Sequence, residues 1–531
     1  MEIRKHYFFT DNKRWVFGSL FLALILLSPI IILAISFFSG SKTTLLYLLD
    51  NVLLDYTLNT IYLIIITSFF ALIFGVFPAW IISNYYFFGR KFFDIVLYLP
   101  LAIPSYIMGF TYIDILSYTG PIQSYLREMN PYLAEIFNKD YLQIEVLGAL
   151  LGLALYPYVY TASRISFSLI GSNYVNISKN LGLSTFQTFY KVILPLSRPA
   201  IFSGLFLVIM EVLNEYGAVK YFGVNTYTTG IFRSWFSFGD VSGAIQLACI
   251  LLVIVLFFFI LDRISIKNSK FYYQKNSQIQ KIKLTNWKKS VFMSSVCFIP
   301  FFFGFLVPFF FILNNVIQTY SLTNFEKLIQ LTGNTVYVAT VASVIIIFVA
   351  LFFLFVERLS KTKINFFTNN LISLGYALPG AIIGLGMILL FSKFSLVGSL
   401  FILIFAYIIR FLAVAKSPIK ASLDKHPNTI DDTGRNLGLN PLNLLRRLHL
   451  PINKFALISA FIVTFIDIMK ELPITLILRP FNFDTLATQT YEFAVEEMIP
   501  LSATYSLVII TLGSLMLLIL KNFIDKQINV S

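Results

Sequence analysis

Apolar runs about as long as a membrane is thick recur along the whole chain, with short polar segments between them. A run of about 20 residues forms a helix that crosses a ~30 Å hydrocarbon layer, because each helical residue rises about 1.5 Å. The runs are rich in Phe, Leu and Ile and are interrupted by Gly and Pro, which favours helices over the alternating strands of a membrane barrel. We predict twelve membrane helices, at residues 15–38, 58–82, 93–116, 144–168, 199–217, 241–262, 291–313, 334–356, 370–392, 397–415, 453–471 and 501–520.

The composition supports this pattern. Hydrophobic residues make up 57% of the 531 residues and charged residues 12%, and the mean hydropathy is +0.79. Soluble globular chains are about 45–50% apolar and about 25% charged. The fold class that we predict is therefore an all-α membrane protein. The first run, 15–38, has no small-residue cleavage site, so we expect a retained helix and not a cleaved signal peptide.

The net charge of +14 could indicate nucleic acid as a partner. Its distribution argues otherwise, because Lys and Arg gather in the segments that face one side of the membrane if the N-terminus is cytoplasmic. This is the positive-inside pattern, and it predicts that the N- and C-termini are both cytoplasmic. Nucleic acid is not needed to explain the charge.

The chain repeats one segment. The stretches "KNLGLSTFQTFYKVILP" and "RNLGLNPLNLLRRLHLP" have the same spacing from Gly182 to Pro195 and from Gly438 to Pro451, and the two copies lie 256 residues apart. This is a tandem duplication. We predict two six-helix repeats, 1–262 and 291–531, joined by a basic cytoplasmic linker at 263–290. Because each repeat has an even number of helices, a pseudo-twofold axis along the membrane normal should relate them.

Each copy of the duplicated segment is predicted to form a short amphipathic helix outside the membrane. Phe186, Phe189 and Tyr190 share one helix face in the first copy, and Leu442 and Leu445 share one in the second. Apolar residues on such a helix indicate insertion into the groove of a partner. The alternative is a helix that lies on the membrane surface, but this would not explain the equal spacing in both copies.

Four acidic residues lie in predicted helices, and each pair is spaced i, i+4 on one face. An ionised acid at the membrane centre costs roughly 2.5–3.5 kcal/mol, so we expect these side chains to face a wet cavity or a cation. Alternatively, Lys470 pairs with Asp467 and the outer acids cap loops. Carboxylate and phenol oxygens suit a hard metal ion, and Glu211 with Asp467 would bind it transiently. The candidate pathway residues are Glu211, Glu215, Tyr216, Asp467 and Glu471.

Three prolines fall within predicted helices, namely Pro100, Pro104 and Pro379. Proline removes a backbone hydrogen bond and kinks a helix, so these positions are candidate gates or hinges. Proline is also common in membrane helices, so a purely structural kink is an equal alternative.

The duplicated segments resemble the "EAA" loop of ABC importer permeases, in which an acid and two small residues precede Gly and a later Leu-Pro. The loops would span about 170–198 and 416–454. This sequence departs from the pattern, because Asn176 replaces the first acid and Ile177-Ser178 and Thr433-Gly434 replace the paired alanines. With the helix faces above, the resemblance implies these ATPase-coupling residues: Gly182, Phe186, Phe189, Tyr190, Leu194, Pro195, Asp432, Gly438, Leu442, Leu445, Leu450 and Pro451.

Wider stretches, such as "YLPLAIPSYIMGFTYIDILSYTGPIQ" at 98–123 and "KELPITLILRPFNFDTLATQTYEFA" at 470–494, are similar to the ferric-iron branch of these permeases. The resemblance implies a fused type I importer permease of the bacterial inner membrane that works by alternating access. It implies two copies of a cytoplasmic ABC ATPase and a periplasmic iron-binding protein as partners, besides membrane lipid. ATP and Mg would bind to the ATPase, because this chain has no Gly-Lys dipeptide for a phosphate-binding loop.

Other functions are open. Thiamine permeases share the fused plan, so thiamine or another small cation is an alternative substrate. A secondary transporter driven by an ion gradient can also have twelve helices in two halves, but it has no reason to keep the EAA loops. We do not predict an enzyme, because no catalytic group of residues is evident and a separate subunit would hydrolyse ATP.

Overall fold

The computed structural model describes residues 2–267, 282–283, 286–360, 362–394 and 396–530. These residues are almost entirely helical and form two compact units. Unit 1 contains 2–40, 325–488 and 515–530, and unit 2 contains 41–324 and 489–514. Much of the predicted linker, at 268–281 and 284–285, lies outside the described residues.

The helices of unit 1 come mainly from the second half of the chain. They are α1 (Glu2–Phe38), α16 (Phe325–Leu359), α17 (Lys363–Ile372), α18 (Gly380–Phe391), α19 (Leu400–Leu423), α20 (Thr429–Asn436), α21 (Pro441–Leu444), α22 (Leu450–Ile452), α23 (Lys454–Met469) and α24 (Pro473–Leu478). Two further helices, α25 (Leu486–Val495) and α26 (Ile499–Val530), contribute residues to both units.

Unit 2 contains the helices of the first half and the two that follow the linker. They are α2 (Lys42–Asn51), α3 (Leu53–Asn84), α4 (Arg90–Val96), α5 (Ser105–Leu116), α6 (Pro121–Met129), α7 (Pro131–Phe137), α8 (Ile144–Asn180), α9 (Thr185–Thr188), α10 (Leu194–Asn214), α11 (Gly217–Tyr221), α12 (Tyr227–Phe232), α13 (Val241–Lys267), α14 (Trp287–Phe301) and α15 (Val307–Thr319). Its two strands are β1 (Tyr85–Tyr86) and β2 (Ile282–Lys283).

The described helices include many that could cross a membrane. Nine are long and apolar enough to do so, and three bent pairs raise the possible total to twelve. The bends are 92° between α4 and α5, 109° between α17 and α18, and 78° between α22 and α23. The chain is therefore a multi-pass membrane protein. The predicted number of twelve spans is the upper bound of what these helices allow.

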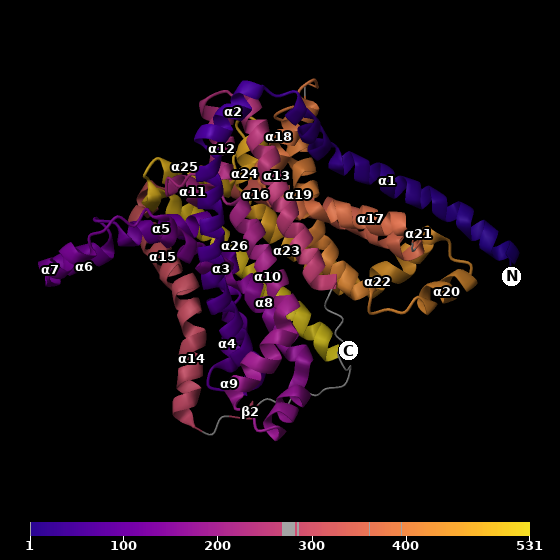
Figure 1. Ribbon diagram of the computed structural model, residues 1–531, viewed down its shortest axis with the longest axis horizontal. Helices are drawn as coiled ribbons and strands as arrows, with labels where there is room; N and C mark the ends of the chain where they lie inside the picture. The colour runs from indigo at the N-terminus through magenta and orange to yellow at the C-terminus, as the bar shows by residue number, and fades with distance from the viewer. Residues whose placement is uncertain (1, 268–281, 284–285, 361, 395, 531) are drawn as a thin grey trace. The chain divides into compact units, whose positions relative to one another are not determined.

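Helices α3, α8 and α10 form the centre of unit 2, where they lie side by side (Figure 1). Small residues allow this close packing, as is usual between membrane helices. A Cβ atom added to Gly152 of α8 would lie 2.5 Å from the Cβ of Phe70 on α3, and one on Gly148 would lie 2.6 Å from Ile66. Larger residues at these two positions would force α3 and α8 apart.

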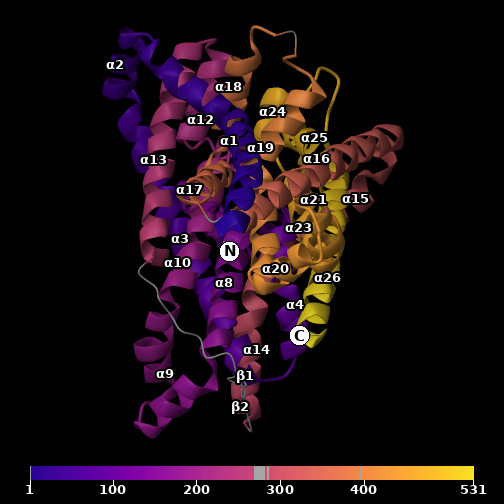
Figure 2. The same ribbon diagram turned by 90° about the vertical axis from the view of Figure 1, so that its right-hand side faces the viewer.

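In unit 1, helices α16, α19 and α23 pack together, and α1 lies against α16, α17 and α18 (Figure 2). A Cβ atom on Gly386 of α18 would lie 2.6 Å from the carbonyl oxygen of Pro29 in α1. The ring of Trp15 also meets that of Phe352 with their centroids 6.0 Å apart. The first helix of the chain thus belongs to the core of unit 1.

The first helices after the linker, α14 and α15, show the converse arrangement, because they belong to the second half of the sequence but pack within unit 2. The hydroxyl of Tyr112 in α5 donates to the carbonyl of Phe303, and the amide of Phe88 donates to the hydroxyl of Ser290. Strands β1 and β2 pair in parallel at Tyr85 and Ile282. Each half of the sequence therefore places its leading helix in the unit built mainly from the other half. The predicted repeat boundaries at 262 and 291 describe sequence similarity, which these contacts do not test.

Candidate functional site

In each of the two duplicated segments, 176–195 and 432–451, a helix ends just before the equivalent glycine. Gly182 has φ +78° and Gly438 has φ +83°, a left-handed conformation that only glycine adopts without strain. The next amide closes the turn in both copies, from Leu183 to the carbonyl of Ser178 at 3.0 Å and from Leu439 to that of Gly434 at 3.1 Å. This geometry explains why glycine stands at the same place in each copy.

The first duplicated segment has an exposed apolar face and a buried anchor. The side chains of Phe186 and Tyr190 are exposed, at 73% and 63%, whereas Phe189 is only 7% exposed. The ring of Phe189 lies 5.0 Å from that of Trp80 on α3 and 6.3 Å from that of Phe167 on α8. The three aromatic residues predicted on one face therefore do not behave alike. Two are exposed, and Phe189 is buried in unit 2.

The second duplicated segment follows the same plan with different residues. Leu442 is exposed and Leu445 is partly exposed, while Leu444 is buried. A Cβ atom on Gly434 would lie 2.6 Å from a methyl group of Leu444, so even the alanine that the EAA pattern has at this position would require Leu444 to move. Both segments contain a π-turn, at Phe189–Ile193 and at Leu445–His449, and these turns are 256 residues apart like the sequences.

The Leu-Pro pairs mark the end of each duplicated segment. Leu194 and Pro195 begin α10, which continues from the π-turn without a break. Leu450 and Pro451 instead form the short α22, and the chain bends by 78° before α23. The two copies therefore begin alike but end differently, because the first continues into a helix and the second bends before the next helix.

A buried ionic network fixes the second segment to the end of α16. The carboxylate of Asp431 lies 2.6 Å from the Nε of Arg358 and 2.7 Å from the Nε2 of His449. Arg358 also donates to the carbonyls of Leu423, at 2.6 Å, and His426, at 3.1 Å. One guanidinium thus joins α16, the loop before α20 and, through Asp431, the π-turn.

The sequence did not predict this network. It pointed to Asp432, which matched the acid of the EAA pattern. The side chain of Asp432 is 67% exposed and lies 3.9 Å from Arg435, whereas the side chain of Asp431 is 7% exposed. The only signal in the sequence was the Asp-Asp pair itself. Its partners, Arg358 and His449, are distant in sequence, and no spacing rule connects them.

In unit 2, Glu215 is a structural partner for helix ends. Helix α10 ends at Asn214, and Glu215 accepts a hydrogen bond from the amide of Ala218 at 2.9 Å. It also accepts one from the hydroxyl of Ser105, the first residue of α5. A carboxylate near helix N-termini is stabilised by their amides and dipoles. Glu215 is thus the first residue after the helix that contains Glu211.

Glu471 has the same role in unit 1 and gains a charged partner. Its carboxylate accepts a hydrogen bond from the amide of Ile474 at 3.2 Å and lies 3.3 Å from the Nε of Arg410. Arg410 also donates to the carbonyl of Leu378 at 2.6 Å. Helix α23, which contains Asp467, ends at Met469, two residues before Glu471.

The two inner acids are less enclosed. Glu211 and Asp467 are partly exposed in their units, and Asp467 lies 3.0 Å from the ammonium of Lys470 on the next helical turn. Tyr216 is buried and stacks on Phe232 with a ring separation of 3.7 Å. Within the described residues, no group of three His, Cys, Asp or Glu side chains could hold a metal ion.

The three prolines lie at breaks and not within continuous helices. Pro100 is in the 3₁₀ turn Leu99–Ala102, and Pro104 directly precedes α5. Pro379 directly precedes α18. The bends of 92° and 109° occur at these places, because proline cannot donate the hydrogen bond that would continue a helix.

These features define a class of protein. Bent pairs of apolar helices, together with a repeated segment that packs on the helices of its unit, are typical of membrane transport proteins. Residues 71–269 match the family described as binding-protein-dependent transport system inner membrane component. This part of the chain is therefore similar to the membrane components of such transport systems.

Individual relatives extend this match. The chain is 25% identical over 484 residues to the Fe(3+)-transport system permease protein FbpB 2 of Haemophilus influenzae, which covers 88% of this chain and 90% of that protein. It is 29% identical over 166 residues to the sulfate transport system permease protein CysT of Salmonella typhimurium, covering 30% and 55%. It is also 29% identical over 153 residues to the molybdenum transport system permease protein ModB of Haemophilus influenzae, covering 28% and 63%.

Proposed function

We propose that this chain is the membrane permease of an ATP-driven importer that takes ferric iron from a periplasmic binding protein. The observation that carries this is the similarity to an Fe(3+)-transport permease over 88% of the chain. The matches to the sulfate and molybdenum permeases cover only about a third of the chain. They support the class of transporter but not those substrates.

The duplicated segments would each bind one ATPase subunit on the cytoplasmic side. The exposed Phe186 and Tyr190 suit insertion into a groove, as does Leu442 in the second copy. Movement must then reach the membrane helices. Phe189 would carry it to α3 and α8 through packed rings, and Asp431 would carry it to α16 through Arg358. Two copies are needed because two ATPase subunits close together on ATP.

Alternating access would use the breaks at Pro104 and Pro379 as hinge points. Glu215 and Glu471 hold helix ends at the broken segments of their units, so we assign them a positioning role. The partly exposed Glu211 and Asp467 remain our candidates for transient contact with ferric iron, and Tyr216 lies close to Glu211 in sequence. Carboxylate oxygen is a ligand type that hard cations prefer. A pseudo-twofold axis along the membrane normal would place the two inner acids in equivalent positions.

Uptake by the reconstituted complex tests this function. Proteoliposomes containing the permease, its ATPase and its binding protein should accumulate labelled ferric iron only when ATP is supplied. Labelled thiamine, sulfate and molybdate, each with the same complex, are the matched comparisons. Uptake of thiamine in place of iron would overturn the substrate. Uptake that follows an ion gradient without ATP would overturn the ABC mechanism.

A further inference from the structure

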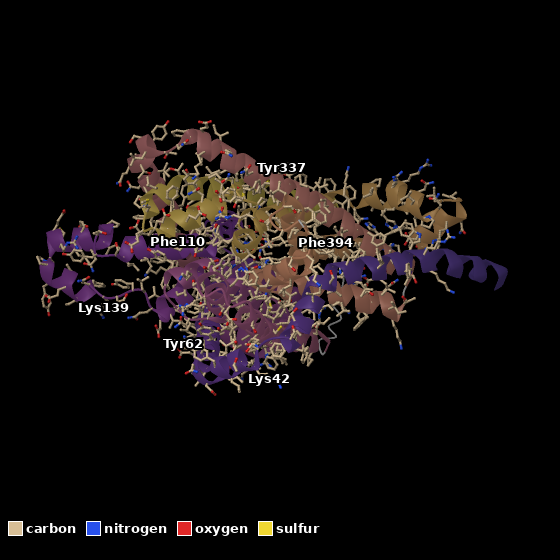
Figure 3. All side chains as sticks on the ribbon, turned by 90° about the horizontal axis from the view of Figure 1, so that it is seen from above. Lys42, Tyr62, Phe110, Lys139, Tyr337 and Phe394 are labelled. Atoms are coloured by element: carbon tan, nitrogen blue, oxygen red, sulfur yellow. The ribbon has the colours of Figure 1, made fainter. Side chains whose placement is uncertain are left out.

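Unit 2 contains a helical hairpin that the transport mechanism does not use. Helices α6 and α7 lie between α5 and α8 in the chain and contact one another, with α6 also contacting α5. In Figure 1 the hairpin extends away from α3, α8 and α14 of the same unit, and Lys139, labelled in Figure 3, follows its end. The corresponding connection in the second half, from α18 to α19, is the short stretch 392–399. The hairpin is therefore an addition to the first half only.

Both helices of the hairpin expose apolar residues on one side, and together these residues are called its apolar face. In α6 the exposed apolar residues follow the spacing i, i+3, i+7, and in α7 they follow i, i+1, i+4, i+5, which places each set on one side of its helix. Tyr132 is 71% exposed and Met129 is 68% exposed, values that a monomeric soluble domain rarely allows for a cluster. The residues of this face are Ile122, Tyr125, Met129, Tyr132, Leu133, Ile136 and Phe137.

Polar groups are kept off this face. The guanidinium of Arg127 turns back to donate to the carbonyl of Tyr118 at 2.6 Å and lies over the Tyr118 ring, 4.1 Å from its centroid. The side chain of Asn130 accepts the amide of Leu133 and so satisfies the start of α7. Glu135 is exposed and Glu128 is half-buried, and by helical spacing both lie at the edge of the apolar positions. The face can therefore lose water without burying an unpaired charge.

We propose that this hairpin lies in the membrane interface, with its apolar face among the lipid chains of the leaflet opposite the first duplicated segment. The hairpin follows α5, part of a bent pair that could cross a membrane, and leads into α8, which could cross one alone, so a bilayer around these helices would lie next to it. Beyond its second end, Tyr62 of α3, labelled in Figure 3, donates to Glu145 at the start of α8 at 2.9 Å and so joins these two helices. Tyrosines flanking an apolar helix are typical of this depth.

Charge favours lipid over a protein partner. The stretch 117–143 has two basic side chains, Arg127 and Lys139, against three acidic ones. It offers no strong charge for the electrostatic steering that speeds the encounter of two proteins. Burial of aromatic and aliphatic side chains then supplies most of the favourable free energy, and the adjacent bilayer provides an apolar phase without any second protein. In this position the hairpin would hold the α5 end of the broken span at a fixed depth.

Spin-label accessibility tests the proposal directly. A parent variant with Cys249→Ala and Cys297→Ala receives one cysteine at Tyr132 or Phe137 on the apolar face, or at Glu128 or Glu135 as matched controls. Each labelled permease is placed in nanodiscs of phosphatidylglycerol and phosphatidylethanolamine without other subunits. The apolar-face labels should collide severalfold more with oxygen than with a water-soluble nickel chelate, and the two controls should show the reverse.

Two results would overturn the proposal. One is equal access of the nickel chelate to apolar and control positions, which would place the hairpin in water. The other is access that is lost only when the binding protein is added, which would make the face a protein-docking surface. Because the measurement needs no substrate and no ATP, it can fail while the proposed iron uptake succeeds, and the reverse also holds. A circular dichroism spectrum equal to that of the parent confirms that each variant is folded.

Discussion

Replacing Asp431 with Ala should release the second duplicated segment from the membrane helices. The carboxylate is the shared partner of Arg358 and His449, and the side chains of all three are at most 10% exposed. Removing one partner of a buried ion pair leaves an uncompensated charge and costs about 3–5 kcal/mol. Asp432 is the matched control, because its exposed side chain and its 3.9 Å separation from Arg435 make an ion pair worth roughly 0–1 kcal/mol.

Hydrogen–deuterium exchange reports the local opening of this segment, which global unfolding of a large membrane protein would obscure. A loss of about 3–5 kcal/mol speeds exchange of the amides in α20 and α21 by roughly 150-fold to 5,000-fold, up to the rate of an unprotected amide. In Asp432→Ala the same amides should exchange as in the parent. Amides in α9 and α10 of the other copy provide an internal reference in both variants.

A second variant separates charge from packing. Arg358→Met, Asp431→Val and His449→Ile together replace the network with apolar residues, and the first copy has Val175 and Ile193 at the positions corresponding to the last two. Such replacements are often neutral or stabilising, so exchange should return toward the parent rate. If Asp431→Ala alone exchanges as slowly as the parent, the network does not hold the segment and our reasoning is wrong.

Four further changes test the remaining sites. Phe186→Ser should leave stability within about 0.5 kcal/mol but weaken ATPase binding roughly 10-fold or more, measured by titration of the ATPase onto the permease. Phe189→Ala should instead lower stability by about 3–5 kcal/mol, because it empties a buried ring site, and thermal unfolding will detect this. Glu211→Gln with Asp467→Asn should abolish iron uptake while ATPase binding persists, and unchanged uptake would remove both from the pathway. Glu471→Gln should cost about 3–5 kcal/mol by leaving Arg410 without its carboxylate, seen as a lower thermal midpoint of the purified protein.

Much of the fold could be predicted from the sequence because long apolar runs indicate membrane helices. The duplicated segment was equally visible, since its glycine, its spacing and its Leu-Pro pair are local features. The environment of single side chains could not be predicted in this way. The spacing of Phe186, Phe189 and Tyr190 predicts one face, but Phe189 turns inward because Trp80 and Phe167, from two other helices, leave a place for its ring.

The acids show the same limit. A spacing of i, i+4 does not show where a helix ends, and α10 ends one residue before Glu215. The apolar pattern continues past that end, because the short α11 is apolar as well. Burial of a charged network such as that of Asp431 depends on tertiary contacts between residues 73 positions apart. Periodicity within one segment does not report such contacts.

The position of α1 has a consequence for biosynthesis. This helix is synthesised well before the surfaces on which it packs, α16 to α18, which are made only after the rest of the first half. Until then its partner side is covered by lipid or by the insertion machinery. The two halves of the chain cannot mature one after the other, and when produced as separate polypeptides they should become protease-resistant only if both are present in the same cell.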